Sequence, residues 1–155
     1  MPERETLERA HEDAREGKSP STQAGEFVRE EIHHVREGKH GARSTKQAIA
    51  IGLSKARRAG VKLGTPKKAS AKVRAQASRD SKKGQSGSKR RTSRTRSRAV
   101  SGELRREGSS AASTRSLSRQ AKSSGKKRGP AARKKAALKA VRTRQRNGAT
   151  SRNAA

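Results

Sequence analysis

Apolar side chains in the first 63 residues recur at the spacing of α-helices, in three separate stretches. The clearest stretch follows Ser19 and Pro20, a signal for a helix start, and ends at Gly38. Its apolar positions are Ala24, Phe27, Val28, Ile32 and Val35. The pattern predicts a helix, and because Phe27 lies within the apolar stripe, we expect this aromatic ring to pack in a core and not to stack on a base.

A shorter helix is predicted before it, over residues 2–16. Leu7, Ala10 and Ala14 fall on one face of that helix. Gly17 follows directly, and glycine suits the left-handed position that closes a helix.

The third stretch carries the sharpest local signal. Residues 44–60 open with Ser44, Thr45, Lys46 and Gln47, which fits a capping box in which Ser44 caps the helix and Gln47 reaches back to the backbone amide of Ser44. Gly60 ends the pattern. Three small residues on one face would let a neighbouring helix approach closely: Ala48, Gly52 and Ala56.

The pattern changes after residue 63. Residues 64–155 hold 29 Lys/Arg and 3 acids, a net charge of +26. The large apolar residues in this segment are Val73, Val100, Leu104, Leu117, Leu138 and Val141. Six such groups cannot offset a chain entropy of about 1–2 kcal/mol per residue. The sequence therefore predicts a long disordered basic tail, with one nascent helix over 130–147.

These patterns predict a mainly α protein with two parts. Residues 1–63 form a small helical module of about three short helices, and residues 64–155 form a disordered polycationic tail. The first part has a net charge of +3 and is near the lower size limit of an independent domain. A protein partner or self-association through residues 1–63 therefore stays open.

The charge of the tail points to nucleic acid as the partner, because neutralising phosphates releases counterions without any reading of base sequence. The chain has no Trp, no Tyr and one Phe, whereas proteins that hold single strands stack bases on aromatic rings. Duplex DNA is therefore favoured over RNA. The residues expected to contact phosphate collectively are Lys67, Lys68, Lys89, Arg90, Arg91, Arg94, Arg96, Arg98, Lys126, Lys127, Arg128, Arg133, Lys134 and Lys135.

Two resemblances add to this picture. Residues 47–60 read QAIAIGLSKARRAG, a motif similar to one in small basic bacterial proteins of a family classed as a domain of unknown function. The similarity extends over residues 26–62 and implies a bacterial protein with a short helical module. It brings no established activity and no catalytic residues.

The second resemblance concerns the tail. Residues 126–146 read KKRGPAARKKAALKAVRTRQR and resemble linker-histone C-terminal domains and the Lys/Ala-rich histone-like proteins of some bacteria. Residues 65–68 read TPKK, which is similar to the (S/T)-P-K-K element of eukaryotic linker-histone tails. The resemblance implies charge screening that brings duplexes together.

Catalytic and metal chemistry find little support in the sequence. There is no cysteine, no phosphate-binding glycine loop and no nucleophile-elbow serine. His33 and His34 point about 100° apart on a helix, so they cannot jointly face one metal. His33 with Glu37 makes an i,i+4 pair and His40 lies in the following loop, and we expect these histidines to face solvent. No enzyme activity, cofactor, metal or small-molecule substrate is therefore expected.

The sequence favours a cytoplasmic, nucleoid-associated location. No apolar run approaches the roughly 20 residues that span a bilayer, so no membrane partner is expected, and the first residues lack the apolar core of a secretory signal. The expected function is sequence-independent DNA binding with histone-like compaction or protection of the nucleoid. Two alternatives stay open: an RNA- or ribosome-associated protein, and a regulatory or plasmid-maintenance adaptor whose helical module binds a protein.

Overall fold

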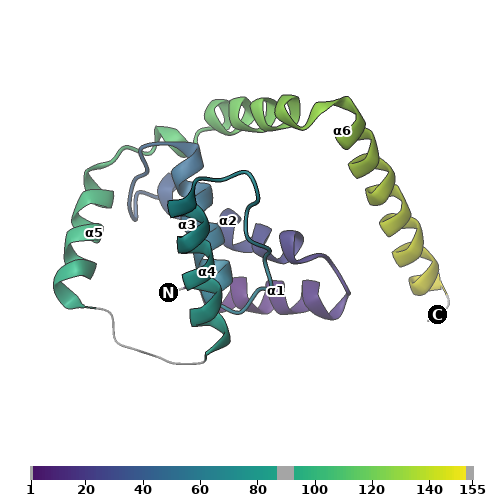
Figure 1. Cartoon of the computed structure of the whole chain (residues 1–155), viewed down its shortest axis with the longest axis horizontal. Coiled ribbons are helices and arrows are strands. Elements are labelled where there is room, and N and C mark those ends of the chain that lie inside the picture. Colours follow the sequence, from purple (N-terminus) through teal and green to yellow (C-terminus); the bar gives the residue numbers. More distant parts are fainter. Residues whose placement is uncertain (1, 87–92, 153–155) are drawn as a thin grey trace. The chain divides into compact units, whose positions relative to one another are not determined.

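The computed structural model describes the backbone of residues 2–86 and 93–152, and the side chains of residues 2–86 and 93–146. Within these ranges the chain forms six α-helices and one short 3-10 helix, so the prediction of a mainly α protein is confirmed. Contacts between residues divide the chain into two units, Met1–Ser116 and Leu117–Ala155, whose helices are labelled in Figure 1.

The first three helices of the structure match the three predicted helices. They are α1 (Arg4–Arg15), α2 (Pro20–Arg36) and α3 (Thr45–Arg58). α2 packs against both α1 and α3 (Figure 1). Gly17 and Gly38 have φ angles of +71° and +72° and close α1 and α2, as their positions in the sequence predict.

A small core forms where these three helices meet. Phe27 of α2 is 1% exposed and packs with the buried Ala10 of α1 and Ala56 of α3. Leu7 and Leu53 cover this cluster as partly buried neighbours. The predicted core position of Phe27 is confirmed, and with it the absence of an exposed aromatic ring in this chain.

The close approach of α2 and α3 depends on the small residues of α3. A Cβ atom built at Gly52 would lie 2.7 Å from the Cα atom of Val28 and 3.0 Å from the carbonyl oxygen of Phe27. Ala48 and Ala56 on the same face of α3 are 0% exposed. The predicted small-residue face is therefore the face that contacts α2.

Only one of the two hydrogen bonds of the predicted capping box forms at the start of α3. Ser44 caps the helix, and its side chain accepts a hydrogen bond from the backbone N–H of Gln47 at 3.2 Å. The return bond goes elsewhere, because Gln47 Oε1 accepts from the backbone N–H of Arg43 at 3.0 Å and not from that of Ser44.

A fourth helix, α4 (Ala71–Gln85), packs against α3. Its buried Asp80 is 2% exposed and accepts three hydrogen bonds. The donors are Ser54 Oγ at 2.7 Å, Arg58 Nε at 2.8 Å and Gln76 Nε2 at 3.0 Å. One of the few acids after residue 63 thus joins the basic end of α3 to the next helix.

The fifth helix, α5 (Arg94–Arg106), buries no residue of its own. Its end is nevertheless held by the loop that precedes α3. The backbone N–H of Gly41 donates to the carbonyl of Leu104 at 2.7 Å, and that of Ala42 donates to the carbonyl of Gly108 at 3.1 Å.

The short 3-10 helix η1 (Ser110–Ala112) packs against α2 and α3. The Thr45 hydroxyl donates to the carbonyl of Ala111 at 2.6 Å, and Arg36 Nε donates to the carbonyl of Ala112 at 2.9 Å. Both alanines are at most 5% exposed. A segment far along the chain is therefore fastened to the N-terminal helices.

The last helix, α6 (Thr114–Arg152), is interrupted once. Gly129 has φ +76° and ψ 164°, which are not helical values, and Pro130 begins the second helical stretch (Figure 1). Ser113 caps the first stretch, since its hydroxyl oxygen accepts from the N–H of Ser116 at 3.2 Å. The break at Gly129 and the start at Pro130 agree with the preference of proline for the first turn of a helix.

The prediction of a long disordered tail over 64–155 is wrong. It counted large apolar side chains and overlooked three other sources of order. The buried Ala77 and the hydrogen-bonded Asp80 dock α4. Hydrogen bonds and two buried alanines fasten the segment around η1, and α6 is rich in Ala, Arg and Lys, which favour helix without a core. The expected nascent helix over 130–147 is present as the second stretch of α6, which begins at Pro130 and continues past residue 147 to Arg152.

The packing at Gly52 yields a first prediction. Replacing Gly52 by Ala should lower the free energy of unfolding by about 1–3 kcal/mol, because overpacking at the α2–α3 contact outweighs the better helix propensity of alanine. Gly25 of α2 is the matched control, since a Cβ built there meets nothing within 4 Å. Gly25→Ala should therefore raise stability by about 0.5–1 kcal/mol in the same urea titration.

A second prediction concerns pH. Burial acts to raise the pKa of Asp80, but the hydrogen bonds from Ser54, Arg58 and Gln76 outweigh it and hold the pKa below the ordinary value of 3.8. The charged carboxylate therefore stabilises the fold above that value, and its contribution is lost as the pH falls through the lowered pKa.

Wild type should exceed Asp80→Asn in unfolding free energy by about 1–3 kcal/mol at pH 7. In urea titrations at fixed ionic strength, this gap should shrink below about pH 4. Glu103→Gln serves as the control, because Glu103 pairs with Arg106 at the surface, where both side chains are about three-quarters exposed. A gap for Asp80→Asn that does not change with pH would contradict the assignment.

Candidate functional site

The basic residues predicted to contact phosphate are spread over several elements. Lys67 and Lys68 lie exposed in a turn between α3 and α4. The remaining described ones are exposed side chains of α5 and α6, namely Arg94, Arg96, Arg98, Lys126, Lys127, Arg128, Arg133, Lys134 and Lys135. Lys89, Arg90 and Arg91 lie outside the described residues.

On α5 the helix sorts the arginines by face. At about 100° per residue, Arg94, Arg98 and Arg105 fall within about 40° of one another, and Arg96 points to the opposite side. All four are exposed. Of the five arginines of α5, three therefore form one row and Arg96 lies on the far face, while the fifth, Arg106, pairs with Glu103.

The second stretch of α6 carries a tighter basic row. Lys135, Lys139 and Arg142 follow one another at intervals of four and three residues, which places them on one face over about 10 Å. All three are exposed. Of these, only Lys135 was among the predicted residues. Helical spacing applied to the expected helix over 130–147 would have found the other two.

The first stretch of α6 repeats this arrangement. Arg119, Lys122 and Lys126 are exposed and follow at intervals of three and four residues, so they also share a face. Thr114–Arg152 contains fourteen Lys/Arg and no acidic residue. Each stretch of the helix thus presents a row of cations with no carboxylate on the same helix to neutralise it.

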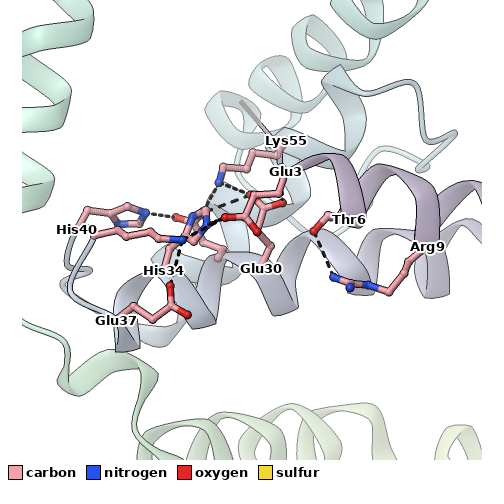
Figure 2. Close-up of polar contacts among 10 residues, drawn as sticks. Glu3, Thr6, Arg9, Glu30, His34, Glu37, His40 and Lys55 are labelled. Atoms are coloured by element: carbon pink, nitrogen blue, oxygen red, sulfur yellow. Dashed lines mark hydrogen bonds and ion pairs between the residues drawn. The ribbon is translucent and has the colours of Figure 1, made fainter.

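A second candidate site lies inside the N-terminal unit, between α2 and α3 (Figure 2). The side chains of Glu30 and Glu31 are 1% and 0% exposed. Lys55 of α3 reaches both, with Nζ 3.0 Å from Glu30 Oε1 and 2.7 Å from Glu31 Oε2. Two buried carboxylates therefore share one ammonium group.

The two carboxylates differ in what else they contact. Glu30 Oε2 accepts from the backbone N–H of Glu3 at 3.0 Å, and the Thr6 hydroxyl also bonds to Glu30. Burial acts to raise the pKa of Glu30, but these donors and Lys55 outweigh it and lower the pKa. Glu31 is held by ion pairs alone, and its Oε1 has no hydrogen-bond partner among the described residues.

Two histidines complete this cluster, and the expectation that they face solvent is wrong for both. His34 is 12% exposed because it lies under Glu3, and His40 is 19% exposed because the loop after α2 folds back over Glu31. His40 Nε2 is 3.3 Å from Glu31 Oε1, and His34 Nε2 is 2.8 Å from Glu3 Oε1. His33, on the outer face of α2, is exposed as predicted.

The electrostatics of the cluster favour charged groups. His34 and Lys39 hydrogen-bond to Glu3 and lower the pKa of this carboxylate to about 2. Burial acts to lower the pKa of Lys55, but Glu31 and Glu30 outweigh it, so its pKa is raised and the ammonium stays protonated. One nitrogen of each imidazole and a carboxylate oxygen of Glu31 all lie within 4.8 Å of one another. Among the described residues, Glu31, His34 and His40 form the one cluster of at least three metal-ligating side chains.

No described helix combines the length and apolarity that crossing a membrane requires.

Comparison with known proteins gives one match. No curated protein and no solved structure matches the chain. Residues 15–69, about a third of the chain, match the model of a family of unknown function, DUF6496. The matched segment spans α2 and α3 and includes Glu30, Glu31, His34, His40 and Lys55. The expected similarity of the helical module to a family of unknown function is confirmed at this level.

Proposed function

We propose that this protein binds nucleic acid without reading base sequence, favours duplex DNA over RNA, and compacts or protects nucleoid DNA. The observation that carries the proposal is the exposed row of Lys135, Lys139 and Arg142 on a helix that contains no acidic residue. The chain as a whole has a net charge of +29. On the exposed surface of α6, Lys and Arg side chains are therefore not balanced by any acidic side chain of that helix.

The physical basis is the release of counterions from the phosphate backbone. Each phosphate that a Lys or Arg neutralises releases condensed cations, which favours binding and makes affinity fall steeply with salt. Helical order adds to this, because side chains already fixed in a row lose less freedom on binding than those of an unfolded segment. The rows on α6 therefore contact phosphates as sets and not as scattered charges.

The preference for a duplex rests on the aromatic residues. Phe27, the one aromatic side chain of the sequence, is 1% exposed in the core. No ring is left to form the stacking platform on which single strands are usually held. Contacts to the backbone of a duplex need no such platform, and no catalytic step forms part of the proposal.

The row on α6 provides the test. Replacing Lys135, Lys139 and Arg142 together by Ala should weaken binding to any mixed-sequence duplex and lower the slope of log K against log[salt] by about 2–3, at about 0.9 per phosphate contact. The matched control replaces Lys127, Lys134 and Arg144, which lie off both rows of α6. It removes equal charge and should lower the slope by less. Fluorescence anisotropy at four salt concentrations measures both.

The same titration separates the alternatives. Equal losses in the two triple variants would mean that total charge and not the row determines binding. Tighter binding to duplex RNA or to a single strand of equal length would favour an RNA-associated protein. An affinity that does not change with salt would contradict phosphate neutralisation altogether.

A further inference from the structure

The buried Glu31 carboxylate is the least satisfied polar group of the N-terminal unit. Its side chain is 0% exposed; Oε2 lies 2.7 Å from Lys55 Nζ, whereas Oε1 has no hydrogen-bond partner in the described structure. A carboxylate without such partners is costly inside a protein. Glu30, one residue earlier, is by contrast bonded by the Glu3 amide, Thr6 and Lys55. Oε1 of Glu31 faces His40 instead of a permanent cation.

The two buried carboxylates carry one more negative charge than Lys55 neutralises. Glu30 and Glu31 are both buried, and Lys55 is the ammonium group that contacts them. Glu3 is occupied by Lys39 at 3.1 Å and by His34. With neutral imidazoles, the buried pair therefore keeps one negative charge in excess.

Each imidazole has one nitrogen engaged with a fixed oxygen. His40 Nδ1 is 3.1 Å from the carbonyl of Gly41, and His34 Nε2 is 2.8 Å from Glu3 Oε1. A histidine that donates one N–H to a carbonyl or carboxylate keeps the lone pair of its other nitrogen free, and metal-binding histidines are held in this way. Figure 2 shows His34, His40, Glu3 and Lys55 gathered at one place.

We propose that Glu31, His34 and His40 bind a divalent transition-metal ion of the Zn²⁺ type. Two imidazoles and one carboxylate suit Zn²⁺, Co²⁺ or Ni²⁺, whereas Mg²⁺ and Ca²⁺ prefer oxygen ligands alone. The donor atoms lie within 4.8 Å of one another, and tetrahedral metal–ligand bonds of about 2.0–2.2 Å require them to close by up to about 1.5 Å. His40 lies in the loop between α2 and α3, where that shift needs no change in a helix.

The ion would supply the positive charge that the buried pair lacks. Lys55 contacts Oε2 of Glu31, so Oε1 is available to the metal and the ammonium stays in place. A hollow of about 250 Å³, lined by Glu3 and Glu30 among others, borders the cluster at His34. Zinc sites with three protein ligands take a water molecule as the fourth ligand. The site would tie the loop at His40 to α2, independently of the basic rows on α6.

The experiment uses the full-length untagged chain, freed of nucleic acid and of metal by nuclease, high salt and a chelator. Zn²⁺ is titrated in competition with a chromophoric chelator, and Co²⁺ is added separately to record its visible absorption. One Zn²⁺ should bind per chain, and Co²⁺ should give the intense bands of tetrahedral coordination. Bound Zn²⁺ should also raise the melting temperature.

Variants assign the ligands. Glu31→Gln, His34→Ala and His40→Ala should each weaken Zn²⁺ binding by at least about 10-fold and remove the Co²⁺ bands. His33→Ala, which changes an exposed histidine one position from His34, should leave both unchanged. Circular dichroism of the metal-free chains shows which variants remain folded. His40→Ala alters only a loop residue, so it stays decisive if His34→Ala unfolds.

Three results would overturn the proposal. The first is the absence of one-to-one Zn²⁺ binding by the wild-type chain. The second is equal binding by wild type, Glu31→Gln and His40→Ala. The third is loss of binding in His33→Ala alone, which would place the metal on the outer face of α2.

Discussion

The ion cluster of Glu30, Glu31 and Lys55 holds α2 against α3, and the other contacts of the N-terminal unit are arranged around it. Both carboxylates are almost fully buried and face the same ammonium group. Removing one partner of such a group leaves a buried charge unbalanced, at a cost of about 3–5 kcal/mol. These ion pairs require α2 and α3 to lie close together, and the absence of a side chain at Gly52 makes that distance possible. Below the cluster the apolar core is small, since Phe27 packs mostly with alanines.

Structural features that depend only on residues close together in the sequence could be predicted from it. Helix starts at Pro20 and Ser44, helix ends at Gly17 and Gly38, and the core position of Phe27 all follow from local chemistry and helical spacing. The structure confirms each of them. These signals are readable because each is contained within one or two turns of a single helix.

Features that depend on residues far apart could not be predicted in the same way. Asp80 appears in the sequence as one acid in a basic stretch. Its donor Gln76 lies one turn earlier on α4, but the other two, Ser54 and Arg58, become visible only when α4 lies on α3. His34 and His40 belong together because the loop after α2 folds back over Glu31. The basic rows of α6 are a different case, since helical spacing alone reveals them once the segment is taken as a helix. The disordered interpretation concealed the row on the first stretch, whereas the row on the second stretch lies within the predicted helix over 130–147 and could have been found there.

The break at Gly129 has a geometric consequence for the charge of α6. A single straight rod touches a cylinder such as a duplex along a short line, and charges farther along it lie at growing distance from the surface. Gly129 adopts φ +76°, which residues with a side chain rarely adopt, and Pro130 has no amide hydrogen to bridge the gap. In the proposed complex, two shorter stretches joined at this point would give two lines of contact, one for Arg119, Lys122 and Lys126 and another for Lys135, Lys139 and Arg142. In the proposed binding to duplex DNA, this one glycine would let the cations of α6 follow the phosphate backbone in two directions.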